Sequence, residues 1–428
     1  MLELNLIRRE PEKVKAGLRK RNWKEEDLAI VDRILALDEE RRQLQTRLDG
    51  MLAESNKISK DIGQLFRQGK REEAEALKEQ VSTMKEEIKA LQARKADVEA
   101  RLEELLLSVP NIPHPSVPAG STDADNEIYK DWTGPLPQLP DDAQPHWELA
   151  RQYGIFDLEL GAKLTGAGFP VFRGQGARLE RALINFFLDE ARAAGYEEIQ
   201  PPLLVNADTA RGTGQLPDKE GQMYYVEKDD LYLIPTAEVP ITNIYRDEIV
   251  PEELLPIKMA GYTPCFRREA GSYGAHVRGL NRVHQFDKVE IVQIAHPDHS
   301  YEVLDEMLAH VSGLLDKLEL PYRIVRLCGG DLGFTSALTY DFEVWSAAQQ
   351  RWLEVSSVSN FETYQSNRMK LRFRGKDKKT RLAHTLNGSA LALARIVAAL
   401  LENNQTPEGI RIPAVLVPYT GFDCIKAD

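Results

Sequence analysis

The chain of 428 residues carries 55 Lys and Arg against 67 Asp and Glu, a net charge of -12, and is long enough for two or three domains. It contains no run of eighteen apolar residues, and its opening MLELNLIRRE carries charges where a signal peptide requires an apolar stretch. Three cysteines without a C-x-x-C spacing argue against a disulfide framework and a Cys-built zinc site. These features predict a cytoplasmic protein with no membrane partner, and the acidic balance by itself counts against a nucleic-acid partner.

The charge is distributed unevenly along the chain. Residues 1–110 hold 23 basic and 23 acidic side chains, whereas the following 318 residues hold 32 basic and 44 acidic ones. The acidic surplus therefore lies wholly in the C-terminal part. The N-terminal part has no net charge and keeps enough cations for a phosphate-facing stripe, so the overall acidic balance does not exclude nucleic acid as a partner of this part.

Residues 30–105 show the heptad spacing of a coiled coil. Apolar residues recur in steps of three and four over 34–62 and again over 77–105, and charged residues occupy the other faces. Between the two series, Gly63 and Gly69 can reverse the chain direction. We expect an antiparallel hairpin of two helices, each about 45 to 50 Å long.

Two features of this hairpin bear on its surroundings. Arg41 and Lys95 fall at seam positions, and we expect both to extend outwards towards neighbouring carboxylates. The basic residues Arg67, Lys70 and Arg71 near the turn suit a phosphate backbone, although such a group is commonly just a solvated tip. Taken alone, the pattern fits a dimerising or scaffolding coiled coil equally well.

A proline-rich segment, VPNIPHPSVP at residues 109–118, indicates a domain boundary near residue 110. We therefore expect an N-terminal domain at 1–110 and a C-terminal domain at 111–428. In the latter, the patterns predict helices at 176–194, 299–318 and 390–402, and strands at 231–234, 288–294, 322–327, 342–345 and 352–355. Irregularly spaced strands, some in adjacent pairs, favour an α+β fold with an antiparallel sheet over alternating βαβ units.

The densest group of chemically versatile residues is YTPCFRREAGSYGAHVRGLNRVHQFDKVE at 262–290. Arginines here alternate with Phe266 and Phe286, which together offer planar cations and an aromatic face to a nucleotide. Surface ion pairing on a polar sheet face is the alternative. Neither the phosphate-binding G-x-x-x-x-G-K-[ST] pattern nor a strand-turn-helix G-x-G-x-x-G occurs in the sequence, so ATP would have to bind on another scaffold.

The segments F-R-R-E and H-Q-F-D-K-V-E of this region resemble motif 2 of the class II aminoacyl-tRNA synthetases, and the whole chain is similar to the bacterial-type seryl-tRNA synthetases. Four further blocks follow the order of that family. Residues 176–202 resemble motif 1, Thr236-Ala237-Glu238 the serine-binding T-A-E, Glu354-Val355-Ser356-Ser357 an ATP-binding block, and Asn387-Gly388-Ser389 with Arg395 motif 3. The N-terminal hairpin resembles the tRNA-binding arm of the family. The resemblance implies a class II catalytic domain on an antiparallel sheet flanked by helices.

The resemblance also implies roles for individual residues. Arg267 would bridge the serine carboxylate and the α-phosphate, Glu269 would contact the adenine end and Arg395 the γ-phosphate, which makes these three the expected catalytic residues. The expected ATP set is Arg267, Arg268, Glu269, Val283, Phe286, Glu354, Val355, Ser356, Ser357 and Arg395, with Phe286 stacked on adenine. The expected serine set is Thr236, Ala237, Glu238, Arg267, Glu290, Asn387 and Ser389, with Glu290 accepting the side-chain hydroxyl.

A metal is expected only together with the nucleotide. Glu354 and Ser357 resemble the residues that hold Mg²⁺ with ATP, and their hard oxygen atoms suit that ion. No permanently bound metal is expected. His296 and His299, in H-P-D-H, are interpreted as part of a polar loop because no third ligand follows in the pattern.

Some positions depart from the common family pattern. Arg268 stands where serine is usual, Ala275 and His276 where a Lys-Asp pair is frequent, and Ala390 and Ala394 where glycines are common. The changes at 275 and 276 put the loop's contacts to the tRNA acceptor end in question.

The implied function is activation of L-serine with ATP to seryl-adenylate, followed by transfer to the 3′-terminal adenosine of tRNA(Ser), by a homodimer that pairs through the motif 1 helix. One alternative is a ligase that loads an amino acid onto a carrier protein, which the arm disfavours. A second is a non-catalytic coiled-coil protein, which the matching arginines and carboxylates disfavour. A third is a class II synthetase for threonine or proline, which the arm and T-A-E together disfavour.

Overall fold

The computed structural model describes residues 1–139, 143–218, 220–270 and 277–427. The chain forms two compact units. One comprises Leu2–Arg19 and Trp23–Pro110, and the other comprises Met1, Lys20–Asn22 and Asn111–Asp428. The assignment of separate functions to residues 1–110 and 111–428 stays a prediction.

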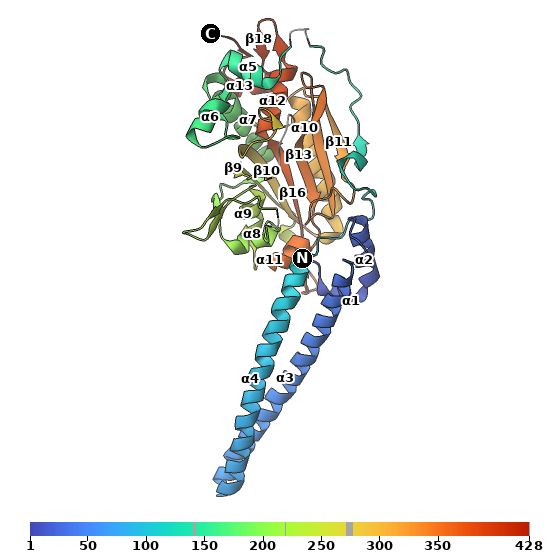
Figure 1. Cartoon of the computed structure of the whole chain (residues 1–428), viewed down its shortest axis with the longest axis vertical. Coiled ribbons are helices and arrows are strands. Elements are labelled where there is room, and N and C mark those ends of the chain that lie inside the picture. The colour runs from blue at the N-terminus through green and yellow to red at the C-terminus, as the bar shows by residue number, and fades with distance from the viewer. Residues whose placement is uncertain (140–142, 219, 271–276, 428) are drawn as a thin grey trace. The chain divides into compact units, whose positions relative to one another are not determined.

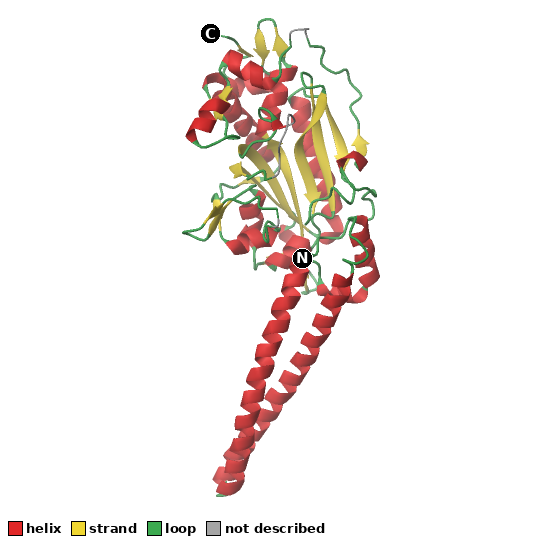
Figure 2. Ribbon diagram, in the orientation of Figure 1, coloured by secondary structure: helices red, strands yellow, loops and turns green. Residues whose placement is uncertain are grey.

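The first unit is an antiparallel helical hairpin (Figure 2). Its helices are α1 (Leu4–Arg9), α2 (Pro11–Lys20), α3 (Ala29–Arg67) and α4 (Arg71–Ser108). The long helices contain 39 and 38 residues, about 58 and 57 Å at about 1.5 Å per residue, so the predicted length was too short. Gly63 lies inside α3, contrary to the prediction that it turns the chain. The turn lies at Gly69, whose φ of 78° is costly for other residues.

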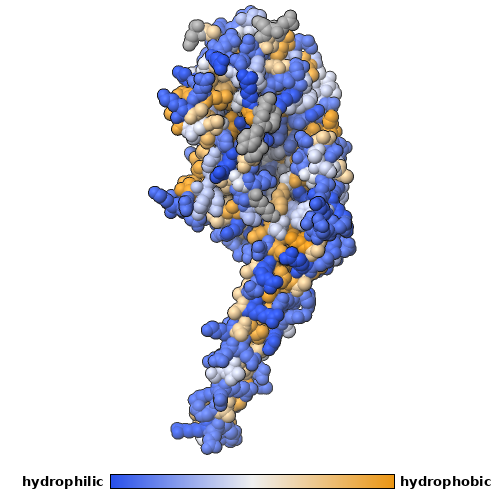
Figure 3. Space-filling model, viewed as in Figure 1, coloured by the Kyte–Doolittle hydropathy of each residue, from blue (hydrophilic) through white to orange (hydrophobic). Residues whose placement is uncertain are grey.

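The two long helices pack through two apolar clusters. The buried members are Leu44, Leu48, Ile88, Leu91 and Val98 in one cluster, and Ile58, Val81 and Met84 in the other. Lys95 extends outwards to a carboxylate as predicted, with its Nζ 2.9 Å from Glu99 Oε1, whereas Arg41 Nη2 lies 3.0 Å from Oδ1 of the buried Asp38. Hydrophilic side chains cover most of the visible hairpin (Figure 3).

The second unit is built on an eight-stranded sheet in the order β1-β11-β12-β13-β16-β10-β9-β4 (Figure 1). Every neighbouring pair is antiparallel except β4 with β9. The strands are β1 (Glu127–Lys130), β4 (Glu197–Glu198), β9 (Ile257–Phe266), β10 (Gln285–Ala295), β11 (Tyr322–Arg326), β12 (Leu338–Ser346), β13 (Arg351–Asn360) and β16 (His384–Ala392). The predicted α+β fold with an antiparallel sheet and an N-terminal helical hairpin is confirmed.

The long helices that pack against this sheet include α7 (Gly174–Ala193), α10 (Ser300–Lys317) and α12 (Leu393–Asn403). They contribute Phe186, Val311 and Ile396 to one large apolar core. The prediction that the last helix begins at residue 390 was wrong, because β16 continues through Ala392, which pairs with Lys288 of β10. Pairing in the sheet overrides the high helix propensity of the alanines here.

Shorter elements surround the core sheet. The remaining helices are α5 (His146–Tyr153), α6 (Leu158–Leu164), α8 (Ala207–Thr213), α9 (Glu238–Thr242), α11 (Tyr364–Met369) and α13 (Val417–Thr420). The remaining strands are β2 (Phe156–Asp157), β3 (Val171–Phe172), β5 (Leu204–Val205), β6 (Tyr225–Val226), β7 (Leu231–Leu233), β8 (Ile249–Pro251), β14 (Arg372–Arg374), β15 (Thr380–Leu382), β17 (Gln405–Thr406), β18 (Gly409–Arg411) and β19 (Cys424–Ile425). In the described part of the chain, no helix is long and apolar enough to cross a membrane.

Candidate active site

A buried carboxylate, Glu290, lies at the centre of the sheet. It stands on β10 opposite Ser389 of β16, and it is 1% exposed. Thr236 Oγ1 and Ser389 Oγ donate to its Oε2 over 3.3 and 3.5 Å, and Lys288 Nζ lies 2.5 Å from the same oxygen. Among the described residues, no donor forms a hydrogen bond to Oε1. The carboxylate is therefore held through one oxygen and keeps the other for a further hydroxyl donor.

A second buried carboxylate, Glu238, lies next to this group at the start of α9. Its backbone N–H donates to Thr236 Oγ1 over 3.2 Å, and its Oε1 accepts from Gln365 Nε2 of α11 over 2.7 Å. Burial, with a smaller contribution from Glu290, raises the pKa of Glu238 to about 7. Two buried carboxylates beside one lysine leave this pocket with an excess of negative charge, which suits a small ligand that carries an ammonium group.

The sequence did not predict two members of this group, Lys288 and Gln365. Lys288 lies two residues before Glu290 in the same strand, so both face the same side of the sheet, and this spacing could have identified the lysine as a partner of Glu290. Gln365 comes from the short helix α11 and has no local pattern that marks it. Asn387, on β16 beside Ser359, shares the face of Ser389 as expected from the same alternation.

The pKa of Glu238 leads to a pH prediction. A carboxyl group with a pKa near 7 is mostly protonated at pH 6 and mostly ionised at pH 8, and only the ionised form attracts an ammonium group. The KM for a substrate that carries an ammonium group should therefore fall about fivefold to tenfold between pH 6 and pH 8. The matched variant Glu238→Gln should show a raised KM that no longer changes over this range. A pH-dependent KM that survives in this variant would show that another group titrates.

Arginine and phenylalanine form a wall next to the pocket. Arg267 directly follows β9, its N–H donates to His284 O over 2.9 Å, and its guanidinium carbon lies 5.2 Å from the centre of the Phe286 ring. Its Nε is 3.4 Å from the carbonyl oxygen of Pro235, the residue directly before Thr236. The predicted pairing of a planar cation with an aromatic face is thus present, and it adjoins the buried carboxylates.

The residues that follow Arg267 contact other parts of the same unit. The guanidinium of Arg268 lies over the Tyr224 ring at 5.9 Å, and Glu269 Oε2 accepts from Arg282 Nη1 over 2.8 Å. Glu269 has a φ of 50°, which is uncommon for a residue with a side chain. The pairing with Arg282 was not predicted. Ala275 and His276 lie outside the described residues.

Arg395 of α12 contacts Glu354, another of the expected ATP ligands. Its Nη1 donates to Glu354 O over 2.7 Å and lies 3.6 Å from Glu354 Oε2, and its Nε donates to Asn281 O over 2.8 Å. Ser356 Oγ donates to Ser389 O over 2.6 Å, which joins this group to the pocket.

Three expected ligands lie with their side chains in the apolar cores: Ala237, Val283 and Val355. These residues are at most 4% exposed, side chain and backbone together. Their side chains therefore belong to the packing that supports the site, and a direct contact with a ligand stays a prediction.

The oxygen atoms near Glu354 suit a divalent cation that enters with a nucleotide. The Glu354 carboxylate is 50% exposed, and the Ser357 hydroxyl donates to Asp341, an unpredicted residue of β12. Burial and the nearby Glu354 raise the pKa of Asp341 well above its ordinary value, so added positive charge would be favourable here. No group of three His, Cys, Asp or Glu residues suited to a metal exists in the described ranges.

Comparison with known proteins begins with two family models. The model "tRNA synthetase class II core domain (G, H, P, S and T)" matches residues 224–404, the range that holds every expected ligand named above. A second model, "Seryl-tRNA synthetase N-terminal domain", matches residues 1–113. The fold is therefore that of a class II aminoacyl-tRNA synthetase.

Full-length relatives define the family more narrowly. The chain is 54% identical to a protein named serine–tRNA ligase of Salinibacter ruber, with 100% of both chains covered, and 49% identical to one of Prosthecochloris aestuarii, with 99% of both covered. Seryl-tRNA synthetase of Pyrococcus horikoshii, solved with ATP, matches all of both chains with a TM-score of 0.91 and 36% identity. The chain belongs to the seryl-tRNA synthetase family, as the sequence predicted. A prolyl-tRNA synthetase of Giardia lamblia, at 17% identity and a TM-score of 0.56 over 63% of this chain and 54% of its own, shares the fold alone.

Proposed function

We propose that this chain activates L-serine with ATP to form seryl-adenylate and then transfers serine to the 3′-terminal adenosine of tRNA(Ser). The observation that carries the proposal is the pocket around Glu290. Three donors converge on one carboxylate oxygen and leave the other for the serine hydroxyl, while Glu238 and Thr236 are placed to receive the ammonium group. Membership of the seryl-tRNA synthetase family supports the same substrate.

Activation requires the serine carboxylate to attack the α-phosphate in line, so positioning and charge neutralisation dominate the chemistry. Arg267 adjoins both the pocket and Phe286, and we assign it to the carboxylate and the α-phosphate between them. Phe286 stacks on adenine, Glu269 contacts the adenine end, and Arg395 meets the γ-phosphate. A guanidinium suits these positions because it stays charged and contacts phosphate through two N–H groups.

The nucleotide brings Mg²⁺ with it in this proposal. Glu354 and Ser357 would hold the ion, and Asp341 fixes the Ser357 hydroxyl through its hydrogen bond. When bound, the ion would supply positive charge that offsets the charge on the phosphates. No step relies on a permanently bound metal.

Specificity follows from the buried groups. A site built to hydrogen-bond a hydroxyl rejects alanine by about 10⁴-fold, because Glu290 would lose the donor for its free oxygen. Threonine carries the same hydroxyl and one additional methyl group, so pocket volume must exclude it.

We infer a cytoplasmic homodimer from the family rather than from α7 itself. The apolar residues of that helix, Leu179, Leu183, Phe186 and Phe187, are buried within their own chain. These residues therefore offer no partner surface for the pairing that was predicted through this helix. The described cysteines Cys265, Cys328 and Cys424 are free thiols, which fits a reducing compartment.

The hairpin of α3 and α4 is assigned to tRNA binding through shape and phosphates. Deletion of residues 30–105, with a short glycine linker, should leave serine activation within about twofold, because every proposed serine and ATP ligand lies in the other unit. Charging of tRNA(Ser) should fall by at least about a hundredfold, because the phosphate contacts of the arm are lost. Equal loss of activation and charging would contradict this division of roles.

The experiment that tests the proposed function is aminoacylation of total tRNA with each standard amino acid in turn. We expect serine alone to be attached, and only to tRNA(Ser). Attachment of another amino acid, or attachment of serine to a carrier protein but not to tRNA, would refute the proposal.

A further inference from the structure

The N-terminal end of α5 is buried against the segment that precedes β10. His146 is 0% exposed, and its Nε2 accepts the N–H of Leu280 over 2.8 Å. Its Nδ1 must therefore carry the proton, and it donates to Glu402 Oε1 over 2.7 Å. The backbone N–H of His146 donates to the same oxygen over 3.0 Å. This histidine is thus bonded on both sides of its ring, in the neutral form with the proton on Nδ1.

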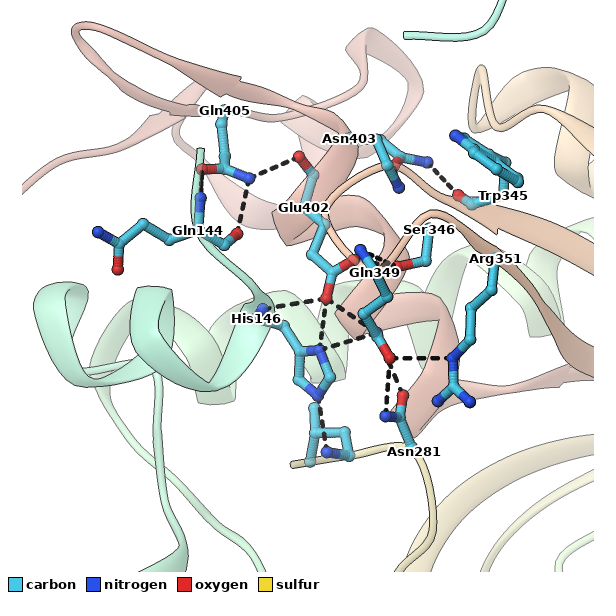
Figure 4. A network of polar contacts seen from close by, with 12 residues as sticks. Gln144, His146, Asn281, Trp345, Ser346, Gln349, Arg351, Glu402, Asn403 and Gln405 are labelled. Carbon is cyan, nitrogen blue, oxygen red and sulfur yellow. Dashed lines mark hydrogen bonds and ion pairs between the residues drawn. The ribbon is translucent and has the colours of Figure 1, made fainter. Parts of the chain in front are cut away.

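The contacts around His146 close into a hydrogen-bonded ring that includes Arg395; Figure 4 shows the part of it formed by His146, Glu402, Gln349 and Asn281. Leu280 is followed by Asn281, whose carbonyl accepts Arg395 Nε over 2.8 Å. Arg395 and Glu402 stand seven residues apart on α12, on about the same side of the helix, and Glu402 returns to His146. Gln349 bridges the ring, since its Nε2 donates to Glu402 Oε1 over 3.0 Å and its Oε1 accepts from Asn281 Nδ2 over 2.9 Å.

Gly279 packs closely against the imidazole of His146 and leaves no space for a side chain. Gly279 has a φ of 68°, and a Cβ atom there would lie 2.2 Å from His146 Nε2, so a side chain at this position would displace the imidazole. Trp147 and Glu148, which follow His146 in α5, contact Arg278 of the segment that carries Gly279 and Leu280. Arg278 lies 4.7 Å above the Trp147 ring and 3.2 Å from Glu148 Oε1.

We propose that His146 is a positioning residue for ATP: by holding Leu280 and Glu402 together, it fixes Asn281 O and thereby the guanidinium of Arg395 at the γ-phosphate. The inference rests on the proposed function, because it takes the role of Arg395 from there. It assigns no contact between His146 and substrate. Loss of this hydrogen-bonded ring of residues should weaken the binding of ATP, which carries the γ-phosphate, far more than the binding of a ligand that lacks this phosphate.

The test compares ATP with a non-hydrolysable seryl-adenylate analogue, which has no β- or γ-phosphate. In His146→Leu, the KM for ATP in serine-dependent ATP–pyrophosphate exchange should rise about tenfold, whereas the Kd of the analogue should stay within about twofold. His146→Gln keeps an acceptor for Leu280 N–H and should recover part of the ATP affinity. Equal weakening of ATP and analogue would show a purely structural role and overturn the proposal.

A double-mutant cycle tests whether His146 affects the KM for ATP through Arg395 or independently of it. In an Arg395→Ala background, His146→Leu should add less than about a twofold further rise in the KM for ATP. Multiplicative effects of the two changes would overturn the proposal. If His146→Leu fails to fold, Gln349→Leu takes its place, because it removes a half-buried side chain that bridges the same hydrogen-bonded ring. This variant must also raise the KM for ATP, by a smaller factor, and leave the Kd of the analogue unchanged.

A matched control uses another buried histidine. His384 is 9% exposed and its Nδ1 lies 2.7 Å from Ser300 Oγ, with no contact to the ring. His384→Leu should leave the KM for ATP within about twofold, and an equal rise there would count against a special role for His146. Absence of serine-dependent exchange in the unaltered chain would refute the proposed function instead, so the two failures can be told apart.

Discussion

Replacement of Arg267 by alanine should lower kcat/KM for serine activation by at least about a thousandfold, equivalent to about 4 kcal/mol of transition-state stabilisation. Arg267 stands between the pocket of Glu290 and the Phe286 ring, where the serine carboxylate and the α-phosphate must meet. Two anions approach each other there, and a fixed cation offsets their repulsion without any reorganisation.

The structure also indicates that this variant should remain folded. Within the described residues Arg267 forms no ion pair, and its guanidinium makes only the 3.4 Å contact to Pro235 O and the stacking on Phe286. The free energy of unfolding should therefore change by no more than about 1 kcal/mol. ATP–pyrophosphate exchange and thermal unfolding on the same sample would measure both quantities.

Arg267→Lys serves as the matched variant. It keeps the charge but loses the planar fork that contacts two anions at once, so it should recover only a small part of the activity. Activity near that of the unaltered chain in Arg267→Ala would remove this residue from the mechanism.

The second large effect is expected at Glu290. Its replacement should reduce kcat/KM for serine by about 10³- to 10⁴-fold and abolish the preference for serine over alanine, because the acceptor for the hydroxyl is lost. The simple Glu290→Ala variant has a complication. It leaves the ammonium of Lys288, 6% exposed in its side chain, without its partner, and an unpaired buried charge costs about 3 to 5 kcal/mol.

A pair of variants avoids this difficulty. Glu290→Met with Lys288→Met removes both charges together, removes the acceptor oxygens and keeps approximate volumes, so the fold should survive while the preference for serine is lost. Measurement of kcat/KM for serine and for alanine gives the preference directly. If the double variant still prefers serine by several orders of magnitude, Glu290 is not the determinant of specificity.

Much of the architecture could be predicted from sequence because it rests on local periodicity. The heptads of α3 and α4 predicted the hairpin, and the irregular spacing of the strands predicted the antiparallel sheet. The errors arose where local propensity competes with the tertiary context. Gly63 is tolerated inside a long helix that packs along its length, and Ala390–Ala392 is drawn into β16 by pairing with β10.

The site was predictable only as far as motifs extend. Arg267, Glu290, Ser389 and Thr236 come from four segments that the fold brings together, and the resemblance to the family named each of them. Gln365, Asp341 and His146 carry no motif in the sequence. Gln365 and His146 act on residues far along the chain, Glu238 and Glu402, and Asp341 acts on Ser357 across a pair of strands whose register no motif marks.

The most direct measurement of the central claim is ATP–pyrophosphate exchange by the purified chain, with each standard amino acid offered separately. The pocket of Glu290 and Glu238 predicts exchange with serine, with alanine lower by about 10⁴-fold. Absence of exchange with serine, together with exchange driven by a different amino acid, would contradict it.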